Sequence, residues 1–174
     1  MEVWLIFQRL ACPIQRILLE RRMYTRAELS KIRTEFWITF GQYMKPVPNA
    51  QGRRTNWPNY KTGVKDIYFR MRAERDHAAI AIELGHADLE MQELVLDQFS
   101  QLKKILEGCL EEEWIWRLHV ANDLGQITSK IEYVLEGVNV LDSNDWPSII
   151  SFLKPRIIAL DDFWDQVKPG FEDF

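Results

Sequence analysis

Apolar and polar residues alternate along two neighbouring runs of the chain, between residues 60 and 86. The apolar positions are Ile67, Phe69 and Met71 in the first run, and Ile80, Ile82 and Leu84 in the second. Alternation with a period of two places one set on a core face and the other set on the opposite face of a sheet. We therefore predict a β-hairpin, with a turn at Arg75 and Asp76 that puts Tyr68 opposite Glu83.

Helical spacing of apolar residues predicts three helices, over about 26–44, 88–110 and 142–167. Thr25 and Glu28 form a T-x-x-E capping box at the start of the first helix. Asp88 is placed to cap the second helix. Pro155 lies inside the third helix and is expected to kink or split it.

A second pair of strands is predicted over 114–120 and 127–135. The first alternates Trp114, Trp116, Leu118 and Val120 with Arg117 and His119. The second puts Lys130 and Glu132 on the polar side. The polar stretch 49–60 indicates a loop that ends in a short edge strand.

The order helix, hairpin, helix, hairpin, helix is typical of an α+β domain. We expect a mainly antiparallel sheet of four to five strands, covered by helices on one face. Residues 23–174 form this single domain, and residues 1–22 are an N-terminal extension with four Arg against two Glu. The extension is an amphipathic anchor, an extra helix, or sequence from an upstream start codon. We favour the last, because the predicted start of the first helix follows directly after Met23, and because Pro13 interrupts any earlier helix.

Composition narrows the class of protein. Seven Trp and nine Phe in 174 residues predict a core rich in rings and are compatible with a homodimer. The net charge of −4 argues against nucleic-acid binding by bulk charge but leaves room for a local basic patch. Cys12 and Cys109 give no disulfide framework, which favours the cytoplasm. The apolar run 3–7 is too short to span a bilayer, so we predict no membrane partner.

Two carboxylates suggest one enzymatic hypothesis, a divergent PD-(D/E)XK nuclease. Asp66 and Glu83 have suitable spacing to hold Mg²⁺, but the lysine expected two residues after the glutamate is missing, and Lys61 or Lys65 would have to replace it. The simpler interpretation is that Glu83 pairs with Arg70 or bonds Tyr68. His77 and His86 lack H-x-x-H or C-x-x-C spacing, so we predict no metal site and interpret them as exposed or hydrogen-bonded.

The non-catalytic hypothesis is a binding surface on the polar side of the sheet. Its candidate residues are Tyr68, Arg70, Arg72, Glu83, Arg117, His119 and Lys130. A basic face with a ring suits a phosphate-bearing or acidic partner, either nucleic acid or protein. The alternative is that the long loop and salt bridges to Glu83 and Glu132 cover this face. Both interpretations remain open from the residues alone, and we favour a non-catalytic interaction module.

Five segments carry a resemblance to a known family: Thr34–Trp37, Tyr68, the IAIEL run at 80–84, TSKIEYVLEGVNV at 128–140 and DWPSIISF at 145–152. Together they resemble the bacterial domain of unknown function 4268. The resemblance covers about residues 23–174. Members of that family occur alone or fused behind restriction-endonuclease-like domains, which implies a link to DNA processing or defence. The resemblance transfers no catalytic residue.

Overall fold

The computed structural model describes residues 24–122, 125–172 and 174. The hypotheses on residues 1–22 concern a segment outside that range. Among the described residues, no helix has the length and apolar character needed to cross a membrane.

The first helix, α2, spans Arg26–Met44 and has the predicted capping box. The Glu28 amide donates to Thr25 Oγ1 at 3.2 Å, and the Thr25 amide donates to the Glu28 carboxylate at 2.8 Å. The side chains of Phe36, Phe40 and Met44 are fully buried. The helix therefore begins at its cap and turns one apolar stripe toward the core.

Four antiparallel strands form one sheet in the order β1-β2-β4-β3. The strands are β1 Ile67–Ala73, β2 His77–Leu84, β3 Ile115–Ala121 and β4 Ile127–Glu136. In the β1/β2 pair, Tyr68 stands opposite Glu83, as the alternation predicted. The α+β class is confirmed.

The second predicted helix needs correction, and one alternative for the third is excluded. The segment after Asp88 is two helices, α3 Leu89–Gln101 and α4 Lys103–Leu110, separated at Leu102. The last helix, α5 Trp146–Val167, continues through Pro155, so of the predicted kink or split the split does not occur. Pro155 removes one amide donor, but Ser151, whose carbonyl loses that donor, is exposed and can bind water instead.

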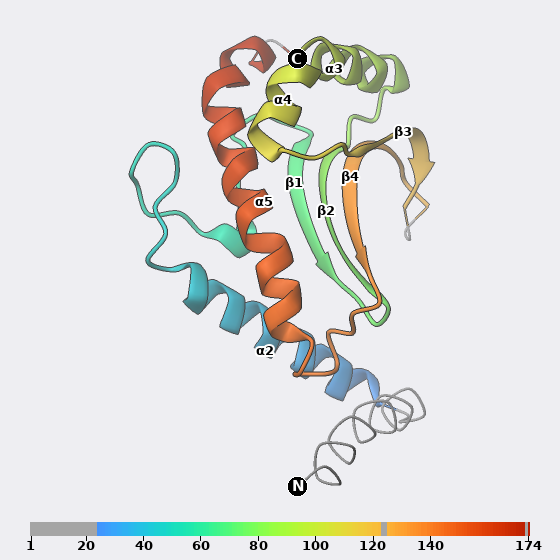
Figure 1. Ribbon diagram of the computed structural model, residues 1–174. Helices are drawn as coiled ribbons and strands as arrows, with labels where there is room; N and C mark the ends of the chain where they lie inside the picture. Colours follow the sequence, from blue (N-terminus) through green and yellow to red (C-terminus); the bar gives the residue numbers. More distant parts are fainter. Residues whose placement is uncertain (1–23, 123–124, 173) are drawn as a thin grey trace, which may run out of the picture.

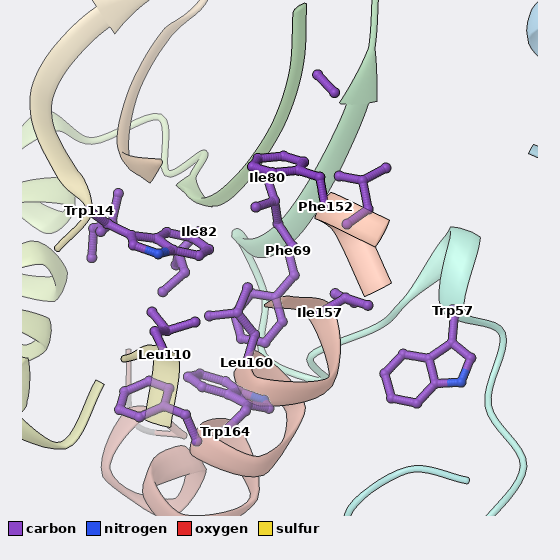
Figure 2. Packing of buried hydrophobic residues seen from close by; sticks show 14 of the residues in the cluster. Trp57, Phe69, Ile80, Ile82, Leu110, Trp114, Phe152, Ile157, Leu160 and Trp164 are labelled. Carbon is purple, nitrogen blue, oxygen red and sulfur yellow. The ribbon is translucent and has the colours of Figure 1, made fainter. Parts of the chain in front are cut away.

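The core lies between one face of the sheet and α5, as Figures 1 and 2 show. Ile80, Ile82 and Leu160 are completely buried. The Trp164 indole donates to the Thr62 carbonyl at 2.9 Å. All six Trp residues in the described part of the chain are buried or half-buried against this core. The core therefore accounts for these six rings, and they give no separate support for a dimer.

The long loop before β1 packs against α5. Tyr60 Oη donates to Asp161 at 2.6 Å, and the Ala50 amide donates to the same carboxylate at 2.6 Å. Burial and the adjacent Asp161 raise the pKa of Tyr60, so its hydroxyl stays protonated and donates. The predicted edge strand is instead a 3₁₀ turn at Trp57–Asn59, and the sheet has four strands. The loop therefore lies on the helix side and does not cover the polar side.

A β-bulge interrupts β3 between Arg117 and Val120. His119 has a φ of 50°, and its amide donates to Ser129 Oγ at 3.1 Å. Leu118, predicted to face the core, is 48% exposed. The predicted alternation is wrong beyond Arg117, because the extra residue shifts which side each later side chain faces.

Candidate functional site: the polar face of the sheet

The polar face is the side of the sheet opposite α5 (Figure 1). Its central residues are Arg72, Ala79, Ala81, Glu83, Arg117, Lys130 and Glu132. All of these except Ala81 and Arg117 line a hollow of about 300 Å³. Among the described residues, none from a helix lines this hollow.

Three ion pairs join the charged side chains at the centre of the polar face. Arg72 Nη2 lies 2.5 Å from Glu83 Oε2. Glu132 accepts from Arg117 Nε at 2.6 Å and lies 2.7 Å from Lys130 Nζ. Glu83 is 8% exposed and Glu132 is 5% exposed, so both carboxylates are desolvated and held by cations. All three cations at the centre are therefore paired with a carboxylate, and the three cations and two carboxylates leave a net charge of +1.

The partner of Glu83 differs from the one predicted. Glu83 pairs with Arg72, while Arg70 lies with its Cζ 4.3 Å from the centre of the Tyr68 ring. Between the positions of Arg72 and Glu83, β2 carries only Ala79 and Ala81 on this face. Because these side chains are small, the long arm of Arg72 can reach along β2 to the carboxylate.

Two of the predicted residues, Tyr68 and Arg70, form a ridge at the β1 edge between two further hollows. The His86 hollow, about 550 Å³, includes Glu83, Gly85, His86 and Ala87. The lysine hollow, about 400 Å³, includes Lys61, Val64 and Lys65. Tyr68 and Arg70 line both hollows. Arg70 is exposed and makes no ion pair with any described residue.

The structure gives the residues of the nuclease hypothesis different surroundings. Asp66, at a φ of 58°, lies 3.8 Å from Lys65 Nζ and accepts a long hydrogen bond of 3.4 Å from Tyr68 Oη. Glu83 is bound by Arg72, and Lys61 lines the lysine hollow. Over the described ranges, no group of three or more His, Cys, Asp or Glu side chains could hold a metal ion.

His119 does not belong to the polar face. The bulge turns its ring toward α3, where Nε2 lies 3.3 Å from the Leu89 carbonyl and 3.8 Å from Glu93. The other predicted residues of the polar side stay together, in two groups. Arg72, Glu83, Arg117 and Lys130 belong to the ion-paired centre, and Tyr68 with Arg70 forms the ridge.

His86 is the functional candidate that sequence reasoning underrated. It is 8% exposed, and its Nδ1 atom has no hydrogen-bond partner. The prediction that such a histidine is exposed or hydrogen-bonded is wrong for His86, although His77 does bond Asp76 at 2.7 Å. Burial lowers the pKa of the His86 imidazole, because the charged form loses hydration.

Gln92 of α3 fixes the rim of the His86 hollow. Its Nε2 donates to the carbonyls of His86 at 2.6 Å and Ile127 at 3.0 Å. Its Oε1 accepts from Ser129 Oγ at 2.8 Å. One sequence signal could have identified this residue: Gln92 is a polar residue in register with the apolar stripe of Val95 and Phe99.

The fold and this face define an α+β domain with one helix-covered side and one polar side that carries paired buried charges. A family model matches residues 32–168, and the chain belongs to that family, described as "Domain of unknown function (DUF4268)". The predicted family is thereby confirmed. Neither the curated proteins nor the solved structures gave a match.

Proposed function

We propose that this domain is a non-catalytic binding module for a phosphate-bearing partner, contacted at the ridge of Tyr68 and Arg70. One observation carries the proposal: an exposed guanidinium, stacked on a ring, has no carboxylate partner among the described residues. On the polar face itself, Arg72, Arg117 and Lys130 are each held by a glutamate. Arg70 therefore keeps its charge and its donors available for a ligand.

The lysine hollow adds positive charge beside the ridge. Lys61 is exposed and makes no ion pair with a described residue. Lys65 is also exposed and lies 3.8 Å from Asp66, a contact that water and salt screen strongly. These cations, together with Arg70, support local anion binding in a chain whose net charge is −4.

Nucleic acid is the phosphate-bearing partner that we favour. Protein grooves that track a nucleic-acid backbone combine cations with ring or guanidinium surfaces, and the ridge combines both. Members of the family that this chain resembles are also fused behind restriction-endonuclease-like domains. The resemblance therefore also implies a nucleic-acid partner. A protein with a phosphorylated or acidic segment is the competing partner.

The test is binding of a labelled single-stranded oligonucleotide, followed by fluorescence anisotropy over a series of salt concentrations. Arg70→Ala should weaken binding at low salt by roughly fivefold and lower the slope of log affinity against log salt by about 0.7, the value for one lost phosphate contact on a single strand. Arg75→Ala is the matched control, because Arg75 is exposed in the hairpin turn away from both hollows. Absence of binding at low salt would rule out a nucleic-acid partner.

A second candidate, the divergent metal-dependent nuclease, is favoured by one observation. Lys130 of β4 stands directly opposite Glu83 of β2, so a neighbouring strand supplies the lysine that the local motif lacks. In this hypothesis Asp66 and Glu83 would hold Mg²⁺. Shortening of the labelled strand that depends on Mg²⁺ and is lost in Glu83→Gln would support it. A strand that stays intact would count against it.

A further inference from the structure

We infer that the partner is a single-stranded nucleic acid whose phosphates lie along the lysine hollow while one unpaired base enters the His86 hollow. The inference rests on the proposed function and adds the part of the ligand that the phosphate contacts leave undefined. Its basis is the position of the ridge. Tyr68 and Arg70 line both hollows, so a ligand that crosses the ridge contacts both.

The two hollows have different chemistry. The lysine hollow has Lys61 and Lys65 on its wall, which suits an anionic group. The His86 hollow has two exposed aliphatic walls, Leu89 at 43% and Ile127 at 42% exposed. A ligand that fits both must carry a phosphate on one side and a flat group with apolar faces on the other. A nucleotide has this combination.

Polar atoms in the His86 hollow match the edge of a base. Glu83 Oε2 accepts from Arg72, whereas no described residue donates to Oε1, which can accept from an exocyclic amine. Thr128 supplies a hydroxyl. His86 lines the same hollow, nine-tenths buried and without a partner at Nδ1. The Nδ1 atom is itself closed to solvent, so His86 forms part of the wall, and the polar groups that line the hollow for a ligand are those of Glu83 and Thr128.

The hollow is formed before any ligand arrives. The Tyr68 ring packs against the backbone at Gly85, where a Cβ atom would lie 3.1 Å from Tyr68 Cε2. Arg70 covers the ring, and its guanidinium offers a plane for stacking. Gln92 ties the two rims together through the carbonyls of His86 and Ile127. Binding therefore needs little reordering of the protein.

An unpaired strand fits this arrangement better than a duplex. A base inside a duplex would have to leave its stack, at a cost of about a few kcal/mol. A base in a single strand is already free to turn into the hollow.

The experiment compares two labelled probes of equal length with the full chain. One is a single-stranded oligonucleotide, as DNA and as RNA, and the other is the same backbone with every base removed. We expect the intact strand to bind roughly tenfold more tightly, within the range reported for one stacked base. Ala87→Trp should reduce the affinity for the intact strand to that for the abasic strand and leave the abasic affinity unchanged. Ala87 is suitable because it is exposed and lines the hollow.

Gly108→Trp is the control for adding a large ring. Gly108 lies in α4, outside both hollows, and a Cβ atom there meets nothing within 4 Å. This variant should bind both probes as the natural chain does. Arg70→Ala should weaken binding of both probes, because both retain phosphates.

The outcomes separate the two proposals. Equal affinity for intact and abasic strands, with loss in Arg70→Ala, would overturn base insertion and leave the phosphate site standing. An Ala87→Trp variant that still prefers the intact strand would also overturn base insertion. If neither the DNA nor the RNA strand binds at low salt, both proposals fall.

Discussion

The two faces of the sheet bury neighbouring residues of the same strand by different means. On β2, Ile80 and Ile82 are fully buried beneath α5 and its neighbours. On the opposite side, Ala79 is 4% and Ala81 is 0% exposed, although no described helix residue lines the hollow there. Arg72 and Lys130 line that hollow together with Ala79, so long charged side chains surround this small residue.

The comparison shows that a low exposed fraction of a side chain is no measure of how much that side chain stabilises the fold. Burial of apolar surface contributes roughly 25 cal/mol for each Å², whereas desolvated ion pairs often give little net stability. The helix face therefore holds the fold together. The polar face keeps Glu83 and Glu132 desolvated at a cost in hydration, which is more easily explained by a ligand site than by stability.

The largest expected effect comes from removing an aliphatic side chain on the helix face. Ile82→Ala should lower the free energy of unfolding by about 2–5 kcal/mol, because it leaves a cavity in a fully packed core. Val134→Ala is the comparison on the polar face, where the side chain is half-buried and lines the hollow. It should cost about 1 kcal/mol or less. Urea denaturation measures both, and equal losses would remove the contrast between the faces.

A smaller effect is expected when a carboxylate of the polar face is neutralised. Glu132→Gln should cost about 1–3 kcal/mol, because the amide keeps one acceptor oxygen but loses the negative charge, and its NH2 group would face either Arg117 or Lys130. Glu136→Gln is the matched control on the same strand, since Glu136 is exposed, and should change stability by less than about 0.5 kcal/mol. Chemical denaturation at constant salt compares them. A Glu132 variant as stable as the control would show that the ion pairs of Glu132 contribute nothing measurable to the free energy of unfolding.

The smallest effect should be a dependence of stability on pH at His86. The folded protein holds the pKa of His86 below its usual 6.5, so the unfolded chain binds the proton more readily. The contribution of His86 is therefore complete above about pH 6.5 and declines as the pH falls through the lowered pKa. His86→Gln should flatten the stability curve in that window. Denaturant midpoints across a pH series test this, and parallel curves for the natural chain and the variant would contradict it.

Capping motifs and the alternation of apolar and polar residues correctly predicted several helix starts and the pairing of β1 with β2. The capping box at Thr25, the register of Tyr68 with Glu83 and the cap at Asp88 are all present. Each depends on residues only a few positions apart or on strands joined by a short turn. The helix break at Leu102 and the bulge at His119 were not predicted. The bulge involves a partner on another strand, because the His119 amide donates to Ser129 Oγ.

The candidate site was only partly predictable. The alternation placed Tyr68, Arg70 and Arg72 on one side of β1, where the structure has them. It did not predict that Arg72 would bind Glu83 while Arg70 stacks on Tyr68. Such choices depend on the lengths of side-chain arms and on the small alanines between them.

By itself the sequence determined the family, the α+β class and which residues of a strand share a side, because capping and alternation act over a few residues. Only the tertiary structure decided what that polar side contains. The strand order β1-β2-β4-β3 brings Lys130 beside Glu83, and α3 brings Gln92 to the rim beside His86. Pairing between distant segments is set by how helices and strands pack together, so the hollows around Tyr68 and Arg70 exist only in the folded chain.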